Sequence, residues 1–424
     1  MLRTRVFLVT LGLFSSGPMT VPAVGQAADP GALGFTASAT GTALYVGALP
    51  PDLGHVPVRA GFSGAAVSAA GQIGTIFDEL GSQVATGGGG HHAEARARGL
   101  DVNGVVVAGA AEAGAPPTPA PVAAEVSLVN IPGVASASLA RGEAAPVWAD
   151  HTCVGGRPLS FGSGRAVGVA LPVAAIEAAR SDAITELRPV ADSFSVVAEA
   201  HQAASTIRLL PGTPDETTVE LLGETVLRAR ADGKPGGAAL EYAAVGTDPS
   251  APFVRITRGK EVVEFTSQQV FNGGVALAQT PVMEMWIGEP PRGYDQAGGA
   301  RPYVGADGTA ASAVADLVRV QLLTGGGAEG LDVRIGHLEA EVRVPTGTSR
   351  CPVRASQGID DDASTAAGGQ GSSRRPPHRG GVGSGGPCRA SDSPSKHWPQ
   401  TIQSPDGWRQ RILIRPASRR AGQH

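Results

Sequence analysis

The 424-residue sequence is poor in aromatic residues: only 18 are Phe, Trp or Tyr. Lysine is just as rare, with 3 among 34 basic residues, whereas Arg, Ala, Gly and Val are abundant, a usage typical of a GC-rich bacterial genome. No apolar run reaches the 18 residues or so that a membrane-spanning helix needs. The 60 Gly and 33 Pro residues weaken helix interiors and so disfavour long-helix and coiled-coil proteins. A β-rich chain with many turns remains.

The N-terminus has the layout of a secretory signal peptide. Arg3 and Arg5 precede an apolar run from Val6 to Phe14, and small residues then lead to Ala27 and Ala28. This pattern predicts cleavage after one of these two alanines and a secreted or cell-surface location. The apolar run is too short to span a membrane. The alternative interpretation is a buried N-terminal strand.

Three cysteines, Cys153, Cys351 and Cys388, are present. Export to an oxidising compartment favours pairing of structured cysteines, so we predict a disulfide between Cys153 and Cys351. In the chain-entropy description, closing so long a loop contributes about 5 kcal/mol or less. The sequence does not show whether these two residues meet.

Composition divides the chain into three regions. We assign residues 1–28 to the signal peptide, residues 29–353 to a β-rich extracellular body, and residues 354–424 to a tail. The proline-rich segment 115–121 either separates two β domains or forms a long loop within one, because proline donates no ladder hydrogen bond.

The body reads as antiparallel strands. Apolar and polar residues alternate along 218–230, and turn residues at 232–237 allow the segment 239–245 to return as a hairpin partner. The same alternation predicts further strands at 193–201, 254–256, 262–265 and 318–322. Arg258-Gly259-Lys260 turns the chain from 254–256 toward 262–265. The spacing between Val173 and Leu187 also fits a helix, the single segment of useful helical length.

One predicted strand changes face. Between Leu331 and Val344 the apolar positions shift from odd to even numbers near Gly336. A regular strand keeps one set of residues on each face, so we predict a bulge or break at Gly336. The predicted fold class is therefore all-β, with antiparallel sandwich-like sheets, long loops and a disordered C-terminal tail.

The tail differs from the body in charge. Residues 354–424 carry a net charge of +6, whereas residues 1–353 carry −10. Three interpretations stay open: a reading frame displaced from the original one, a native segment that cannot bury enough apolar surface to fold, and a polyanion-binding element. The sequence carries no nucleic-acid-binding motif, so we expect no nucleic-acid partner.

Clusters of reactive residue types are few. His91, His92 and Glu94 are candidate metal ligands, but adjacent residues of a strand point to opposite faces, which favours a solvated loop. His151 and Cys153 could form a base and a nucleophile, yet an exported cysteine with a partner is usually bridged. We expect no catalytic, metal-binding or cofactor-binding residue.

Three further segments can be interpreted either as ordinary structure or as part of a functional site. Gly162 to Arg165 matches neither a nucleophile elbow nor a phosphate loop, and we predict a turn. Asp360 to Asp362 lack the spaced ligands of a calcium loop. Glu284 and Glu289 around Trp286 resemble a glycosidase pair beside a sugar platform, although such spacing is common on exposed strand ends.

Several runs carry a resemblance to a known group. They are Leu210 to Pro214, Thr218 to Leu221, Val226 to Ala229 and Ile335 to Ala340. These runs resemble the N-terminal region of uncharacterised secreted or cell-surface proteins of actinobacteria. In that group a step similar to Cys351-Pro352 precedes immunoglobulin-like modules and an anchor, and this sequence departs from the pattern after Val353.

Together these features predict an exported, non-catalytic cell-envelope or secreted surface protein with a structural or adhesive role. Its expected partners are cell-wall polymers or other surface proteins. The alternative is a secreted carbohydrate-active hydrolase or carbohydrate-binding module on a β-sandwich. Sugar sites usually need aromatic platforms, and the body offers only Trp148 and Trp286.

Overall fold

The structure of the chain is a computed structural model. It describes residues 34–47, 56–69, 71–104, 106–116, 120–148, 158–190, 193–272, 276–280, 282–293, 302–322, 331–347 and 411–412. The predicted signal peptide, Cys153, Cys351, Asp360 to Asp362 and all but two residues of the predicted tail lie outside these ranges.

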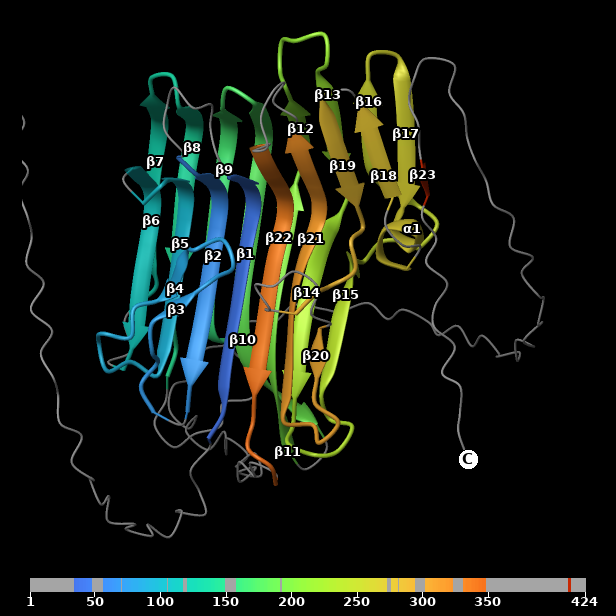
Figure 1. Ribbon diagram of the computed structural model, residues 1–424. Helices are drawn as coiled ribbons and strands as arrows, with labels where there is room; N and C mark the ends of the chain where they lie inside the picture. Colours follow the sequence, from blue (N-terminus) through green and yellow to red (C-terminus); the bar gives the residue numbers. More distant parts are fainter. Residues whose placement is uncertain are drawn as a thin grey trace, which may run out of the picture.

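Two large antiparallel sheets account for most of the described residues, and they stack as two layers (Figure 1). The first sheet has the order β23 (Arg411–Ile412), β18 (Ala276–Thr280), β19 (Met283–Ile287), β21 (Ala310–Leu322), β22 (Leu331–Arg343), β1 (Thr36–Val46), β2 (Val58–Ser68), β5 (Ala93–Val102) and β6 (Val106–Ala115), with β20 (Tyr303–Val304) beside β21.

The second sheet forks at one of its strands. Its main order is β7 (Val122–Ile131), β8 (Ala135–Ala144), β9 (Pro158–Ala170), β10 (Ala174–Val190), β11 (Ser193–Ala204), β14 (Glu224–Ala231) and β15 (Ala239–Val245). From the beginning of β10 a branch continues through β12 (Thr206–Leu209), β13 (Thr217–Leu221), β16 (Pro252–Arg258) and β17 (Glu261–Thr266). A separate hairpin joins β3 (Ile76–Phe77) to β4 (Gln83–Ala85).

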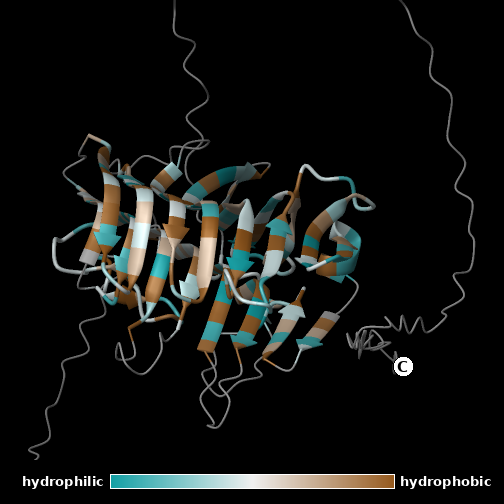
Figure 2. Ribbon diagram, turned by 90° about the horizontal axis from the view of Figure 1, so that it is seen from above, coloured by the Kyte–Doolittle hydropathy of each residue, from teal (hydrophilic) through white to brown (hydrophobic). Residues whose placement is uncertain are grey.

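The predicted hairpins and the all-β class are confirmed. Strand β14 pairs with β15, and β16 pairs with β17 across a turn at Gly259, whose φ is 58°. Seen from above, hydrophobic and hydrophilic residues alternate along the strands of both layers (Figure 2). This alternation is what lets each strand bury one face and expose the other.

The helical interpretation of Val173 to Leu187 is wrong. The segment lies in β10, which pairs with β9 on one side and with β11 and β12 on the other. Its many alanines satisfy helical and extended patterns alike, and pairing on both sides decides the outcome. The run from Thr218 to Arg230 is likewise two strands rather than one, because the chain leaves β13 and enters β14 at Gly223, where a Cβ would lie 2.6 Å from the ring of Phe253.

The core between the sheets has two main parts. One contains Leu44, Val58 and Ile207, and the other contains Phe35, Val67 and Leu338. Both parts take residues from both sheets. Ala108, before the proline-rich segment, and Ala137, after it, belong to the same part of the core.

Six strands of the first sheet change face along one line, which we call the switch row. On each strand the row is the single position that the ladder skips, while the residues on either side of it are paired. These positions lie opposite one another across the sheet and are Leu317, Gly336, Ala43, Gly61, Gly99 and Gly109. Gly336 has a φ of 68°, in the left-handed region that favours glycine. The change of face at Gly336 is present, but the predicted bulge or break is wrong, because β22 is continuous and its register is unchanged on either side.

The two sheets touch almost directly at this level. A Cβ on Gly164 of β9 would lie 2.0 Å from the backbone oxygen of Phe62 on β2. Ser181 of β10 donates its hydroxyl hydrogen to the backbone oxygens of Gly41 and Gly61, 3.0 and 2.6 Å away. The predicted turn at Gly162 to Arg165 is thus wrong, because these glycines lie inside β9 and are needed for the close approach of two backbones.

A single short helix, α1 (Ser267–Asn272), lies among the described residues, and no helix there is long or apolar enough to cross a membrane. A reciprocal cap begins it: Thr266 Oγ1 accepts from the backbone N–H of Gln269, and Gln269 Oε1 accepts from that of Thr266. The Thr-x-x-Gln spacing is a recognised helix-start pattern, so the sequence did contain this signal.

Candidate functional site

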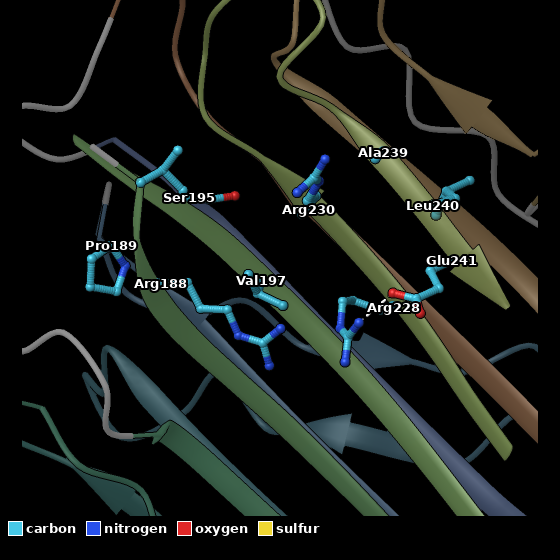
Figure 3. Close-up of a pocket in the computed structure, with 10 residues that line it drawn as sticks. Arg188, Pro189, Ser195, Val197, Arg228, Arg230, Ala239, Leu240 and Glu241 are labelled. Carbon is cyan, nitrogen blue, oxygen red and sulfur yellow. Dashed lines mark hydrogen bonds and ion pairs between the residues drawn. The ribbon is translucent and has the colours of Figure 1, made fainter. Parts of the chain in front are cut away.

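A hollow of about 500 Å³ opens on the outer face of the second sheet (Figure 3). We call it the arginine hollow, and it is lined by Arg188, Pro189, Val190, Ser195, Val197, Arg228, Arg230, Ala239, Leu240 and Glu241. These residues come from β10, β11, β14 and β15. A volume of this size is within the usual range for small-molecule sites.

Strand register places the three arginines around one apolar side chain. Val197 of β11 is opposite Arg230 of β14, and Ser195, two residues earlier on the same face, is opposite Arg188 of β10. Val197 is 1% exposed although it lies on the outer face of the sheet. Val197 therefore forms an apolar floor between guanidinium groups.

Glu199 holds two of these arginines in place. Its carboxylate accepts hydrogen bonds from Arg188 Nη2 and Arg228 Nε, and it also contacts His201 Nε2 at 3.1 Å. Burial by itself would raise the pKa of Glu199, but the hydrogen bonds from His201 and Arg228 and the nearby positive charges lower that pKa to about 2. Glu199 is therefore ionised at neutral pH.

His201 lies between two carboxylates. Its Nδ1 is 2.6 Å from Glu224 Oε1, and its Nε2 contacts Glu199. Burial opposes the charged form of His201, yet the two carboxylates outweigh it and raise the pKa of the ring. A ring with carboxylates at both nitrogens donates both N–H groups and carries a positive charge.

The arginine hollow keeps donors that no described residue accepts. Arg188 uses Nε and Nη2, for Glu186 and Glu199, and Arg228 uses Nε and Nη1, for Glu199 and Glu241. Arg230 is exposed and makes no hydrogen bond or ion pair with any residue in the described ranges. Arginine has five N–H donors, so the hollow presents several that are open to a ligand.

A second carboxylate–histidine–carboxylate cluster lies on the outer face of the first sheet. His337 Nδ1 is 2.7 Å from Asp316 Oδ1, and His337 Nε2 is 2.8 Å from Glu339 Oε1. The ring is 0% exposed. Burial would lower the pKa of His337, but the charge of Asp316 and the hydrogen bonds to Asp316 and Glu339 raise it to about 10.

The loop between β3 and β4 covers this second cluster. The backbone N–H of Glu79 donates to Glu339 Oε1 at 2.7 Å, and the Glu79 carboxylate binds Arg292 and Arg334. Asp316 Oδ2 is 2.8 Å from Arg292 Nη1. We call these residues, together with His337, the covered cluster.

Asp78 of the same loop is almost wholly buried. Burial and the neighbouring carboxylate of Glu339 raise the pKa of Asp78 to about 7. Its Oδ1 accepts from the backbone N–H of Ser82, whereas its Oδ2 has no partner among the described residues. A buried carboxylate without a second partner is most stable when it is protonated.

Glu79, His337 and Glu339 bring ligand-type atoms within 4.8 Å of one another, as a metal site would. The donor chemistry does not fit a metal ion, because Glu79 is held by two arginines and both nitrogens of His337 contact carboxylates. A metal ligand needs a deprotonated ring nitrogen. The cluster is closed by ion pairs instead.

The residues that the sequence suggested as metal ligands are not brought together. His92 Nδ1 contacts the backbone oxygen of Ser68 and its ring stacks on Trp148 with centroids 4.8 Å apart. His91 Nδ1 contacts the backbone oxygen of Pro116. Both histidines lie in the loop before β5 and are half-buried.

The suggested glycosidase pair is also divided. Glu284 accepts from the side-chain amide of Gln279. The guanidinium carbon of Arg319 lies 6.0 Å from the ring centroid of Trp286, over one face of the ring. Burial and the charge of Asp316 raise the pKa of Glu289. The arginine hollow contains none of Glu284, Trp286 and Glu289.

Sequence inspection missed both histidine clusters. The signals were present as Glu199-Ala200-His201 and His337-Leu338-Glu339, in which residues two apart share one face of a strand. The third member of each cluster, Glu224 or Asp316, comes from a neighbouring strand that only the fold identifies.

No protein-family model, no curated protein and no solved structure matches the chain. The fold itself defines the class, an all-β protein of stacked antiparallel sheets. The resemblance to actinobacterial surface proteins stays a prediction from the sequence.

Proposed function

We propose that the chain is an exported, non-catalytic protein of the cell envelope or of the surrounding medium, with a structural or adhesive role. The observation that carries the proposal is the direct contact of the two sheets. Ser181 bonds to the backbones of β1 and β2, and Gly164 leaves no room for a side chain against Phe62. Sheets in this contact resist sliding, which suits a rigid body that holds a surface in place.

The charged clusters support the same role. Each histidine at the centre of a cluster has both ring nitrogens engaged by carboxylates. A catalytic base must instead offer one nitrogen to a reacting proton. The clusters therefore suit charge pairing that fixes strands to one another, and the Arg3, Arg5 and Val6 to Phe14 pattern supports export.

Fractionation of the native host tests this proposal. Antibodies against the body of the protein should detect it in the cell wall or the medium, and N-terminal sequencing should find a chain that begins after Ala27 or Ala28. A cytoplasmic chain that retains Arg3 and Arg5 would contradict export.

A carbohydrate-active hydrolase is the second candidate. Glu284 and Trp286 share a face of β19, which favours it, but Arg319 lies over the ring that would stack on a sugar. Purified protein should show no hydrolysis of neutral or acidic glycans. If hydrolysis occurs and Glu284→Gln abolishes it, the hydrolase replaces the structural role.

A further inference from the structure

We propose that the arginine hollow is a binding site for acidic sugar units, and that an extended acidic polysaccharide lies across the outer face of the second sheet. The inference rests on the adhesive role proposed above and names the partner of that role. It follows from the unpaired donors of the hollow, the exposed apolar residues Pro189 and Val190 in its lining, and a second row of arginines on the same face.

The charge pattern of the hollow favours an anion. Glu199, Glu224 and Glu241 each already contact a positively charged group. Glu186 is likewise engaged, by Arg188. Arg230 is left without an acidic partner among the described residues, on the rim of a preformed hollow. A carboxylate or phosphate group is the ligand that a guanidinium binds best.

Two of the arginines are fixed before any ligand arrives. Glu199 has a side chain that is 5% exposed, and it holds Arg188 and Arg228 from below. These two side chains therefore lose their conformational entropy on folding rather than on ligand binding. Binding groups that are already oriented give a ligand more of its interaction energy.

The remaining lining fits a sugar better than a simple inorganic ion. Pro189 and Val190 are exposed and offer apolar surface to the C–H face of a ring, and the exposed carboxylate of Glu241 offers an acceptor for hydroxyls (Figure 3). A hollow of about 500 Å³ exceeds what a lone anion fills. An acidic sugar combines the charge, the apolar face and the hydroxyl groups.

A row of three arginines on the same face extends the surface beyond the hollow. Arg141, Arg165 and Arg180 lie directly opposite one another on β8, β9 and β10. Like charges in this position destabilise a sheet unless partners offset them. Arg141 lies 3.8 Å from Glu125 and 3.7 Å from Glu143, at carboxylates that are themselves partly exposed. Arg165 is exposed and makes no ion pair with a described residue, whereas Arg180 pairs with Asp182 at 2.7 Å.

The hollow and the row are separated along the strands by a distance that a short polymer spans. Arg180 and Arg188 are both on β10, eight residues apart, which corresponds to roughly 26 Å of strand. A single sugar fills the hollow alone, whereas an oligomer of about six units reaches both places. Two linked contacts bind more tightly than either contact by itself.

Binding of labelled oligomers to the purified chain tests the inference. The probes are an oligogalacturonate, which carries carboxylates, a sugar-phosphate oligomer of equal length, a neutral dextran oligomer, and polyglutamate of equal charge. We expect at least one acidic sugar to bind, dextran not to bind and polyglutamate to bind at least tenfold more weakly. Comparing the oligogalacturonate with the sugar-phosphate oligomer then shows whether the site prefers a carboxylate or a phosphate group.

Variants of exposed arginines locate the site. Arg230→Ala should weaken oligomer binding about tenfold, and Arg230→Lys about threefold, because lysine keeps the charge but loses the planar donor pair. Arg165→Ala should weaken the oligomer about threefold and leave a single acidic sugar unaffected. Arg343→Ala, on the first sheet with a 73% exposed side chain, is the matched control and should change nothing.

The outcomes separate this inference from the proposed function. No binding of either acidic sugar, or equal binding by the chain and Arg230→Ala, overturns the inference and leaves export and a structural role standing. Equal binding of polyglutamate removes the sugar from the claim. Cytoplasmic location of the native protein overturns the proposed function, even if acidic sugars bind in the test tube.

Discussion

The covered cluster around His337 and the open cluster around His201 contain the same three groups in different surroundings. Each has an imidazole between two carboxylates, one of which is two residues away on the same strand. The β3–β4 loop covers His337, which is 0% exposed. The His201 side chain is 18% exposed, and its partner Glu199 binds Arg188 and Arg228 of the arginine hollow. The same motif thus fastens a loop in one sheet and orients surface donors in the other.

The largest expected effect is on stability and separates the two clusters. His337→Gln leaves Asp316 and Glu339 buried with less compensation, which should cost about 3–5 kcal/mol in the free energy of unfolding. His201→Gln affects partly exposed groups and should cost about 1 kcal/mol. Urea unfolding of both variants measures the difference, and equal losses would remove the distinction between covered and open clusters.

The pH dependence of stability should also differ between the clusters. His337 has a pKa of about 10 in the folded protein, above the ordinary 6.5, so the folded state holds its proton more tightly. Its stabilisation is complete below pH 6.5 and is lost as the pH rises toward 10. Asp78, raised from 3.8 to about 7, adds a loss in the same direction between these two values.

The open cluster should respond to acid instead. Glu199 has a pKa of about 2, below the ordinary 4.5, so its stabilisation is present above pH 4.5 and is lost as the pH falls toward 2. In Glu199→Gln the free energy of unfolding should therefore depend less on pH below pH 4.5. In Asp78→Asn it should depend less on pH between about 4 and 7. Unfolding free energies measured from pH 3 to 10 check both expectations. If Glu199→Gln changed only the range from pH 4 to 7 and Asp78→Asn only the acid range, the account would be contradicted.

A smaller effect is expected at the switch row. Gly336→Ala places a side chain at a φ of 68° and its Cβ 2.8 Å from Gln202 Oε1. Left-handed strain of about 1–2 kcal/mol follows. Gly347→Ala, at a φ of 84° with open space around it, carries the strain without the contact and is the control. Equal destabilisation of the two variants would show that close packing at Gly336 is unimportant.

The sequence predicted the class of fold because local patterns carry it. Alternation along 254–265 and turn residues at Gly259 and Asp232-Gly233 identify hairpins whose partners are neighbours in the chain. The change of parity at Gly336 was legible for the same reason. These features depend on residues only a few positions apart.

Features that depend on distant residues were missed. The helical pattern in 173–187 was overridden by strands on both sides, and the glycines of β9 were assigned to a turn because their need for space comes from Phe62 on another sheet. The arginine hollow combines four strands, and Arg188 lies 42 residues before Arg230 in the chain. No local spacing could assemble it.

The measurement that tests the central claim most directly is an NMR titration of histidine rings with an oligogalacturonate. Signals of His201 and His337 are assigned through His201→Gln and His337→Gln in ring-labelled protein. We expect the His201 signal to shift with added oligomer, because its partner Glu199 also holds Arg188 and Arg228, and the His337 signal to stay in place. A shift of His337 with an unchanged His201 would contradict the account.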